Sequence, residues 1–314
     1  MREIVVCGEA LVDVVSATPI PPRAGPLPAL QPALGGGPFN VAITLGRLGS
    51  AVSFCSAVST DTYGEAIMTA LHASGVRTSL VQRRAEPTSL ALATLGTDGA
   101  AHYSFYVEGT ADRTVTDPGP LPSTVGAACF GTLSLALEPG AAVYESLMRR
   151  CRDEGRLVVL DPNIRAAVID DHDAYRRRFA SWLDVVDVIK LSDEDATWLA
   201  SGPAGTSADD WLAAGVVAVV ITAGSEGITV RSPAGTVTSP APPTTVADTI
   251  GAGDSVLGGL MRQLDRLGAL SRPAVAALTI EQWQSIADFA GQVAAITVSR
   301  PGADPPWASE VASD

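Results

Sequence analysis

The segment ADTIGAGDSVLGG (247–259) has the residue types that phosphate chemistry needs. Gly251, Ala252 and Gly253 stand directly before a helical pattern, so their backbone N–H groups can converge on an anion at the helix N-terminus. Asp254 follows in the first turn, where it is either a helix-start residue favoured by the macrodipole or a base beside a bound anion. The second interpretation predicts transfer of a phosphoryl group to a hydroxyl.

A second glycine-rich segment, LGGGPFN (34–40), also precedes a helical pattern. It fits a flexible turn, or a dinucleotide fingerprint that ends at Asn40 with Asp61 about 20 residues later, although that fingerprint needs a preceding strand and the sequence there is rich in Pro. Alternatively, the bare backbone of Gly36 and Gly37 lets a polyol approach, while Asn40 offers it a donor and an acceptor. The chain has only two asparagines, and the presence of one here favours polyol binding.

The segment LDPNIR (160–165), at the end of a strand-like run, has the composition of an ordinary turn. It nevertheless contains the other asparagine, Asn163. It also contains Arg165, whose guanidinium can bind a phosphate in forked geometry. A turn and a phosphate contact are both compatible with this segment.

The only lysine of the chain, Lys190, ends another strand-like run, where its cation can face phosphates. Ser192 is a good N-cap and Asp195 stands three residues later, which makes a capping box with Asp in place of Glu or Gln. The capping box accounts for Ser192 but not for Lys190. Acidic side chains at this place can also hold Mg²⁺ through water.

The segment ITAGSEG (221–227) supplies Thr222, Gly224 and Gly227. This TxGxxG pattern is by itself a turn, and at the edge of a nucleotide site it offers a hydroxyl and bare backbone to phosphates. The sequence has no Walker A loop, because its only lysine does not follow a glycine, and no GxSxG, HRD or DFG motif. Phosphoryl transfer would therefore use a different apparatus.

Strand-like and helical patterns alternate along most of the chain, which predicts an α/β fold with a mostly parallel sheet covered on both faces. The expected strands are 4–8, 51–59, 126–131, 157–161, 187–192 and 217–224, and GITVRS (227–232) with GTVTSP (235–240) suggests a hairpin. The expected helices are 41–49, 141–155, 173–184, 193–200, 251–268 and 282–300, and the segment 61–76 is expected to form a turn and then a helix that ends at Gly75. A β-only stretch at 89–107 and the Pro-rich segment 18–32 can pair as a small flap. Ligands of such folds bind beyond the carboxyl ends of the strands, where the segments above lie.

Composition limits the classes of protein that the chain can belong to. Its 314 residues are 46% hydrophobic, and the net charge is −13, which argues against general binding to nucleic acid or to an anionic membrane. No apolar stretch is long enough to span a membrane, and the N-terminus lacks the pattern of a signal peptide, so we expect a cytoplasmic protein. The cysteines at 7, 55, 129 and 151 form no zinc pattern and are expected to be buried.

Taken together, these segments resemble the PfkB (ribokinase-like) family of carbohydrate kinases over nearly the whole chain. GGGPFNVAITLGRLG resembles its N-terminal signature and DTIGAGDSVLGGL its C-terminal signature. The order GE-x-x-x-D, GG-x-x-N, DPN-x-R, K-x-S, TxGxxG, DTxGAGD is that of the family. GEALVDVV, FYVEGTADR, DPNIR, IKLSDED and VSRPGADP are most similar to fructokinases.

The resemblance implies a ribokinase-like three-layer α/β/α sandwich with a small β-sheet lid. The expected core comprises 1–13, 33–88 and 113–314, and the expected lid comprises 14–32 and 89–112. Such lids often serve in dimerisation, so a homodimer through the lid is expected. The implied reaction transfers the γ-phosphoryl group of Mg²⁺-bound ATP to a primary hydroxyl of a sugar, fructose in the most similar members.

Site residues carry over from the family motifs position by position. Asp254 matches the catalytic base, Gly251, Ala252 and Gly253 match the anion hole, and Arg165 faces the transferred phosphate. Sugar contacts carry over to Asp13, Gly36, Gly37, Asn40, Phe105 and Asn163. Nucleotide contacts carry over to Lys190, Ser192, Thr222, Gly224 and Gly227, with Gly291 and Val293 near the adenine and Asp195 linked to Mg²⁺. Candidates for a K⁺ site are Asp248 and the backbone carbonyls of Ile250, Thr297 and Gly302.

The sequence departs from the family pattern at several positions. Leu11 stands where ribose-specific members often have Asn, which disfavours ribose, and Val107 stands where many fructokinase-like members carry Arg. Val256 replaces a common aromatic residue, and Pro38 replaces a frequent Ala. Other acceptors of the family stay open, namely 2-keto-3-deoxygluconate, ribose and nucleosides. So do two other classes, a catalytically silent sugar- or nucleotide-binding regulator and a nicotinamide oxidoreductase.

Overall fold

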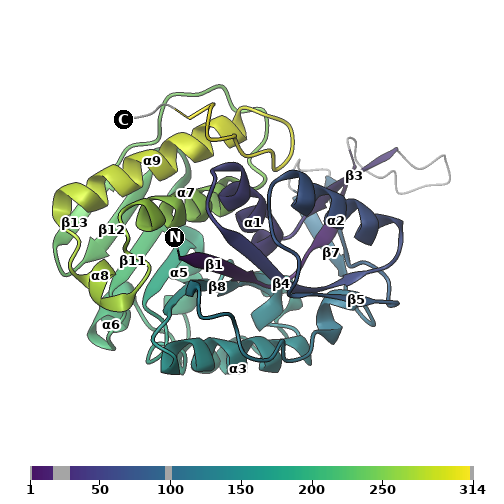
Figure 1. The fold of residues 1–314 in the computed structure, drawn as a ribbon, viewed down its shortest axis with the longest axis horizontal. Coiled ribbons are helices and arrows are strands. Elements are labelled where there is room, and N and C mark those ends of the chain that lie inside the picture. Colours follow the sequence, from purple (N-terminus) through teal and green to yellow (C-terminus); the bar gives the residue numbers. More distant parts are fainter. Residues whose placement is uncertain (1, 17–28, 96–100, 312–314) are drawn as a thin grey trace.

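A nine-stranded sheet lies at the centre of the computed structural model, which describes residues 2–16, 29–95 and 101–311 (Figure 1). Its strand order is β13-β12-β11-β10-β9-β8-β1-β4-β5. The strands from β11 to β5 run parallel, and the hairpin of β12 and β13 continues the sheet antiparallel to β11. The bounds are Glu3–Cys7 (β1), Val52–Ser59 (β4), Val81–Arg84 (β5), Val125–Gly131 (β8), Leu157–Asp161 (β9), Val188–Ser192 (β10), Ala218–Thr222 (β11), Ile228–Ser232 (β12) and Gly235–Ser239 (β13).

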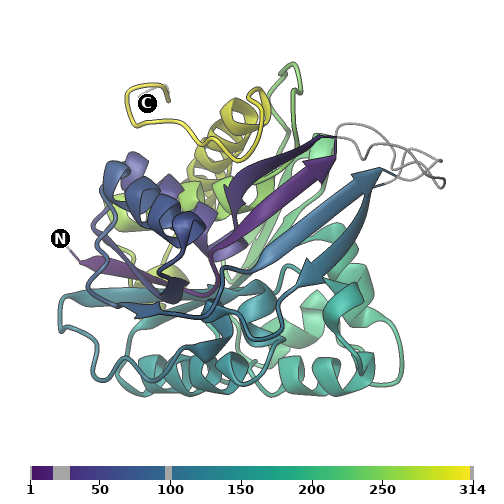
Figure 2. The ribbon, with the colours of Figure 1, turned by 90° about the vertical axis from the view of Figure 1, so that its right-hand side faces the viewer.

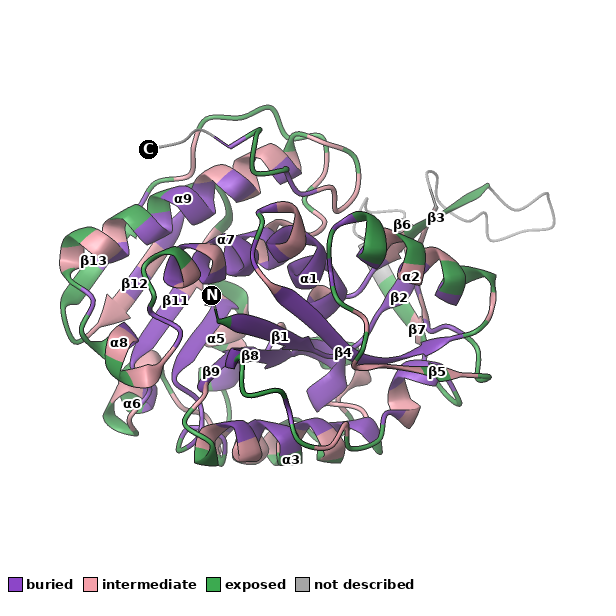
Figure 3. Cartoon of the chain, in the orientation of Figure 1, coloured by how far each residue is buried: buried purple, intermediate pink, exposed green. Residues whose placement is uncertain are grey.

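The central strands are apolar on both faces because helices cover both sides of the sheet. In β1, Ile4 and Val6 belong to one hydrophobic core, whereas Val5 and Cys7 belong to the other. Successive side chains of a strand point to opposite faces, so a strand buried on both sides reads as a continuous apolar run. Figure 3 shows these strands buried along their length. All four cysteines are buried and free, as expected.

The helices form two layers, one on each face of the sheet (Figure 1). One layer contains α1 (Gly37–Arg47), α2 (Thr62–Ala73), α7 (Ala252–Arg266), α8 (Arg272–Ala276) and α9 (Ile280–Val298). The other contains α3 (Gly140–Asp153), α4 (His172–Ala180), α5 (Asp193–Ala200) and α6 (Ala208–Ala213). Among the described residues, no helix is both long and apolar enough to cross a membrane.

Two adjacent glycines let α7 lie close to its neighbours. A Cβ on Gly258 would lie 2.4 Å from Thr44 Cγ2 of α1, and one on Gly259 would lie 2.9 Å from Ala290 Cα of α9. Because α1 carries Asn40 and α7 carries Asp254, this close contact fixes the relative position of two predicted site residues.

We expect Gly258→Ala to destabilise the protein by about 1–3 kcal/mol, because the added methyl group overpacks a buried helix contact. Thermal and urea unfolding would measure the loss. The double variant Gly258→Ala/Thr44→Ser should recover part of it, because serine lacks the Cγ2 methyl group that the new Cβ meets. Equal stability of Gly258→Ala and the wild type would contradict this account of the contact.

A four-stranded sheet in the order β3-β2-β6-β7 forms a lid beside the large sheet (Figure 2). Its strands are Leu11–Ser16 (β2), Leu30–Gly35 (β3), Leu90–Leu95 (β6) and Ala101–Tyr106 (β7). β2 pairs parallel with β6, and the two hairpin-like pairs are antiparallel. β2 and β3 therefore cross the expected boundaries at residues 13 and 33. Most of the Pro-rich segment 18–32 lies outside the described residues.

The α/β/α architecture with a small lid, expected from the sequence, is confirmed. β5 was not among the predicted strands, nor were the short helices α6 and α8 among the predicted helices. In the large sheet, the carboxyl ends of the parallel strands β8, β9, β10 and β11 lie at one edge. The lid rises beside that edge, and the space between them is the candidate site.

Candidate active site

A cleft of about 510 Å³ lies between the lid and the carboxyl ends of the strands. Alternate residues of the lid strands face it, among them Asp13, Val15 and Phe105, because a strand presents every second side chain to one side. Residues that follow the core strands form the opposite wall, as expected for a ligand site of a parallel α/β fold. The predicted residues in this wall are Gly36, Gly37, Asn40, Asn163, Arg165, Lys190, Ser192, Asp195, Thr222, Ile250, Gly251, Gly253 and Asp254.

Asp254 lies buried in the first turn of α7 and faces the cleft. Asn40 Nδ2 of α1 donates a hydrogen bond of 2.9 Å to Asp254 Oδ2. Burial raises the pKa of the Asp254 carboxyl, while Lys190, the Asn40 hydrogen bond and Arg165 counteract part of that rise. A carboxylate that is held in place and has a raised pKa is suited to act as a general base.

The glycine turn before Asp254 adopts the conformation that an anion cradle needs. Gly251 is in the left-handed region, with φ of 76°, and it is the N-cap residue of α7, so the free N–H groups of the helix follow it directly. The Nζ of Lys190 lies 2.8 Å from where a Cβ on Gly253 would stand, so the cation is next to the turn. Backbone donors and a cation therefore meet at one place.

Lys190 reaches this position through a buried ion pair. Its Nζ lies 2.7 Å from Asp161 Oδ2 at the end of β9, and both side chains are almost fully buried. Burial raises the pKa of Asp161 to about 6, although Lys190 lowers it in part. Asp161 Oδ1 accepts no hydrogen bond from the described residues. The structure thus gives Lys190 a fixed partner that the sequence interpretation did not include.

The predicted sugar contacts converge around Gly37. A Cβ on this glycine would lie 3.2 Å from Asn163 Nδ2 and 3.3 Å from Asp254 Oδ1. Asn163 has a left-handed backbone, with φ of 39°, which the turn composition of DPNIR accommodates. Asp13 approaches from β2, and burial followed by the charge of Asp254 raises its pKa to about 6. Two carboxyls and two amides thus surround a volume open to a polyol.

Arg165 lies at the rim of the cleft, with its guanidinium turned toward its own loop. Its Nη1 donates to Asn163 Oδ1 at 2.7 Å and to the Asn163 carbonyl at 3.1 Å. Its charge nevertheless lowers the pKa of both Asp13 and Asp254. The structure brings Arg165 to the predicted site, and its Nη1 donates within the DPNIR turn.

The capping box predicted at the start of α5 is present. Ser192 Oγ accepts from Asp195 N at 3.0 Å, and Asp195 Oδ2 accepts from Ser192 N at 3.4 Å. Asp195 Oδ1 also accepts from Ile164 N at 3.0 Å, so this carboxylate connects α5 to the DPNIR turn. Asp195 and its neighbour Glu194 both line the cleft.

A second cavity, of about 570 Å³, adjoins the cleft through Thr222, Thr249 and Gly253. It is mostly apolar, and the predicted residues that line it are Thr222, Gly224, Gly227, Ala252, Gly253 and Gly291. Its size and position suit the base of a nucleotide whose phosphates lie in the first cleft.

Val293, which the resemblance places near the adenine, does not line this cavity. The α9 residues that do so are Gly291, Ala294, Ala295 and Val298. Val293 lies on another face of the helix, fully buried against Leu48, Phe289 and Val311. Its expected nucleotide contact is therefore corrected to a packing role.

Hydrogen bonds join three of the four residues of the predicted K⁺ site, Asp248, Ile250 and Gly302. Asp248 Oδ1 accepts from Ile250 N at 3.0 Å, and Asp248 Oδ2 accepts from Gly302 N at 2.9 Å. Thr297 is buried, and its Oγ1 donates to the Val293 carbonyl at 3.0 Å. In the described part of the chain, no three His, Cys, Asp or Glu side chains gather as a metal site.

Sequence reasoning missed Glu9 and Thr132 in the cleft wall. Glu9 is buried, accepts hydrogen bonds from the Thr132 and Ser134 hydroxyls and from Ser134 N, and its pKa is raised to about 7 by burial. Glu9 belongs to the GE-x-x-x-D motif, but the motif assigned it no role. Thr132 has a positive φ of 59°, which no residue pattern indicates. Val107 is buried and does not line the cleft.

A buried carboxylate beside a glycine turn, in a cleft under a lid, suits transfer of a phosphoryl group to a hydroxyl. Residues 1–310 match the pfkB family carbohydrate kinase, and the chain belongs to this family. The chain is 36% identical to a fructokinase of Rhizobium leguminosarum bv. trifolii, over 88% of this chain and 83% of that protein. It is 28% identical to Fructokinase-1 of Oryza sativa subsp. japonica, over 98% of this chain and 95% of that protein.

A solved fructokinase structure is also similar to this chain. The fructokinase of Xylella fastidiosa with bound ATP superposes with a TM-score of 0.84 at 26% identity, and the match covers 96% of this chain and 93% of that chain. The family, the phosphotransferase class and the resemblance to fructokinases predicted from the sequence are confirmed.

Proposed function

We propose that this carbohydrate kinase transfers the γ-phosphoryl group of ATP to a primary hydroxyl of fructose, with Asp254 as the base. The observation that carries the proposal is the position of Asp254. It is buried at the start of α7, hydrogen-bonded by Asn40 and adjacent to the Gly251–Gly253 turn. A base and an anion cradle within one helical turn suit transfer of a phosphoryl group to a hydroxyl.

The two oxygens of Asp254 have different roles in this proposal. Oδ2 accepts the Asn40 amide, so the carboxylate cannot rotate freely. Oδ1 lies on the side of Gly37 and Asn163, where the sugar contacts converge. A hydroxyl bound there by Asp13 and Asn163 can give its proton to Oδ1 as its oxygen attacks the phosphorus. The raised pKa of Asp254 strengthens it as a proton acceptor.

The phosphates would lie over the Gly251–Gly253 turn, between Lys190 and Arg165. The N–H groups of the turn and the Lys190 cation face the charge that builds up on the transferred group. Asp195 and Glu194 are the cleft carboxylates that would hold Mg²⁺ through water. Mg²⁺, when bound, neutralises phosphate charge. Asp248, with the carbonyls of Ile250, Thr297 and Gly302, would hold K⁺ behind the turn.

Fructose is the proposed acceptor because the most similar proteins reported above carry the name fructokinase. ADP release from Mg²⁺-ATP should be measured with fructose, ribose, 2-keto-3-deoxygluconate and adenosine. We expect kcat/KM for fructose to exceed that for each other acceptor at least about tenfold, the discrimination that a few lost contacts produce. A higher kcat/KM for another acceptor would reassign the substrate. Thermal stabilisation by ATP without turnover on any acceptor would favour a regulator.

We further propose that the lid forms a homodimer contact. Leu30 in β3 and Tyr106 in β7 are large apolar side chains exposed on the two edge strands of the lid. Open strand edges with exposed apolar side chains are suited to pairing with a second copy. Analytical ultracentrifugation should give twice the monomer mass, and Tyr106→Lys should shift the distribution toward monomer. A monomer at micromolar concentration would contradict the contact.

A further inference from the structure

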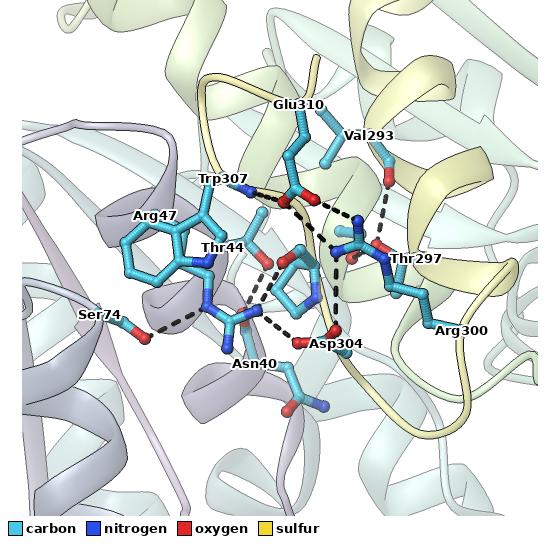
Figure 4. Close-up of polar contacts among 12 residues, drawn as sticks. Asn40, Thr44, Arg47, Ser74, Val293, Thr297, Arg300, Asp304, Trp307 and Glu310 are labelled. Carbon is cyan, nitrogen blue, oxygen red and sulfur yellow. Dashed lines mark hydrogen bonds and ion pairs between the residues drawn. The ribbon is translucent and has the colours of Figure 1, made fainter.

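The C-terminal segment after α9 folds back over α1 as a strap, which we define as residues 300–311 (Figure 4). It contains no helix or strand, and an ion pair between Arg300 and Glu310 joins its two ends. Arg300 Nη2 lies 2.6 Å from Glu310 Oε1, and Glu310 Oε2 accepts from Trp307 N at 2.8 Å. Val311 closes the strap by packing into a small apolar cluster.

One side chain of α1, Arg47, attaches the strap to the core. Its Nη1 lies 2.6 Å from Asp304 Oδ1 and 2.6 Å from the Pro305 carbonyl oxygen, so one guanidinium group meets both. The guanidinium also lies over the Trp307 ring, 5.2 Å from the ring centroid. In addition, Ala308 N donates to the Arg47 carbonyl at 3.0 Å. Figure 4 shows the Arg47 guanidinium beside Asp304 and the Trp307 ring.

The strap contacts the back of the glycine turn. Gly302 N donates to Asp248 Oδ2 at 2.9 Å. A Cβ on Gly251 would lie 2.6 Å from Ala303 Cβ and 3.1 Å from Ala303 Cα, so the strap packs directly against the N-cap residue of α7. Asp304, which Arg47 binds, is the next residue along the strap.

The helix that carries Arg47 also holds the base. Its first turn supplies Asn40, which donates to Asp254 Oδ2. The segment from Asp248 to Asp254 is therefore held from the cleft side by Asn40 and from the outside by Gly302 and Ala303. Arg47 lies on the same helix as Asn40 and contacts the strap at Asp304, the residue after Ala303.

We infer that Arg47 is a positioning residue for phosphoryl transfer, acting through Asp304 and the strap on the Gly251 turn. This inference rests on the proposed role of that turn as the anion cradle. Loss of Arg47 should let the strap lift, so that the N–H groups of the turn lose their alignment with the transferred group. The sugar contacts and the second cavity do not touch Arg47, so substrate binding should change little.

The test is a kinetic comparison of Arg47→Gln, Arg47→Lys and Asp304→Asn with the wild type at 25 °C. We expect kcat of Arg47→Gln to fall about 10- to 30-fold, with KM for fructose and ATP within about threefold. Arg47→Lys should be intermediate, because an ammonium group can pair with Asp304 but lacks the planar guanidinium that lies over the Trp307 ring. The double variant Arg47→Gln/Asp304→Asn should lose less than the sum of the two single losses, since both substitutions remove the shared Arg47–Asp304 contact.

A matched control is Arg231→Gln, which breaks an Arg–Asp pair of 2.7 Å with Asp209 at the surface. It should leave kcat unchanged. A purely structural role of Arg47 would lower Tm but leave kcat at 25 °C within about twofold of the wild type, and that result would overturn the inference.

Hydrogen exchange of the amides in residues 249–254 gives a readout independent of turnover. It should become faster in Arg47→Gln and stay unchanged in Arg231→Gln. If the wild type phosphorylates no sugar, the proposed function fails, and unchanged exchange in Arg47→Gln would separately overturn the coupling of the strap to the turn.

Discussion

Replacing Asp254 with asparagine should lower kcat about 10³-fold while leaving ATP binding intact. Asparagine keeps the shape of the side chain and can still accept the Asn40 amide, but it cannot take a proton from the sugar hydroxyl. General-base catalysis contributes 10²- to 10⁴-fold in enzymes, which sets the expected size. Coupled measurement of ADP release with fructose, and ATP titration by calorimetry, would separate the loss of chemistry from a loss of binding.

The Asp254→Asn substitution should also affect the stability of the protein. The pKa of Asp254 is raised in the folded state, so the stabilisation of its protonated form is lost as pH rises through the folded pKa. Asparagine does not ionise, so the variant does not lose this stabilisation. Its Tm at pH 7.5 should therefore be equal to or higher than that of the wild type. Asp265→Asn, a substitution at the far end of the same helix, is the matched control and should keep wild-type kcat. Turnover of Asp254→Asn within tenfold of the wild type would contradict the base assignment.

The second large effect is expected at Asp13, where Asp13→Asn should lower kcat/KM for fructose by about 10- to 100-fold. A hydrogen bond between a carboxylate and a sugar hydroxyl contributes about 1.5–3 kcal/mol, and asparagine weakens it by removing the charge. ATP binding should be unchanged, because Asp13 lies on the lid strand β2, away from the second cavity.

The raised pKa of Asp13 predicts that the KM for fructose depends on pH. Burial and the charge of Asp254 raise its pKa to about 6, so the charged form that binds sugar is lost below about pH 6. The KM for fructose should rise there in the wild type and stay flatter in Asp13→Asn. The raised pKa favours folding at low pH, and that contribution is lost as pH rises through about 6. Asp13→Asn should then not lower Tm at pH 7.5. A wild-type KM independent of pH between 5 and 7.5 would contradict this role.

The parts of the fold that the sequence predicts are those with strong local patterns. The run from Ile4 to Cys7 is apolar at every position because both faces are covered, and Ser192 with Asp195 forms the capping box that their spacing predicts. β5 was missed because VQRR (81–84) lies at the sheet edge, where no apolar run is required. The short helices α6 and α8 contain too few turns for a periodic pattern.

Most of the residues that line the cleft were among the sequence-based candidates, but Glu9, Thr132 and the contacts between side chains were not predicted. Glycine spacing indicates a cradle before Asp254, whereas the Asn40 hydrogen bond joins residues that lie far apart in the chain. The pairing of Lys190 with Asp161 depends on two adjacent parallel strands, and the face of α9 that carries Val293 depends on how that helix packs. These features follow from tertiary arrangement, which single-sequence patterns do not encode.

We expect the phosphoryl group to pass to a sugar hydroxyl and not to water. Phosphorus NMR of the protein with Mg²⁺-ATP and fructose tests it most directly, because the spectrum separates a sugar phosphomonoester from inorganic phosphate. We predict that a phosphomonoester signal grows in step with ADP in the wild type and grows about 10³-fold more slowly in Asp254→Asn. ADP accompanied only by inorganic phosphate, or equal phosphomonoester formation by both proteins, would contradict the account.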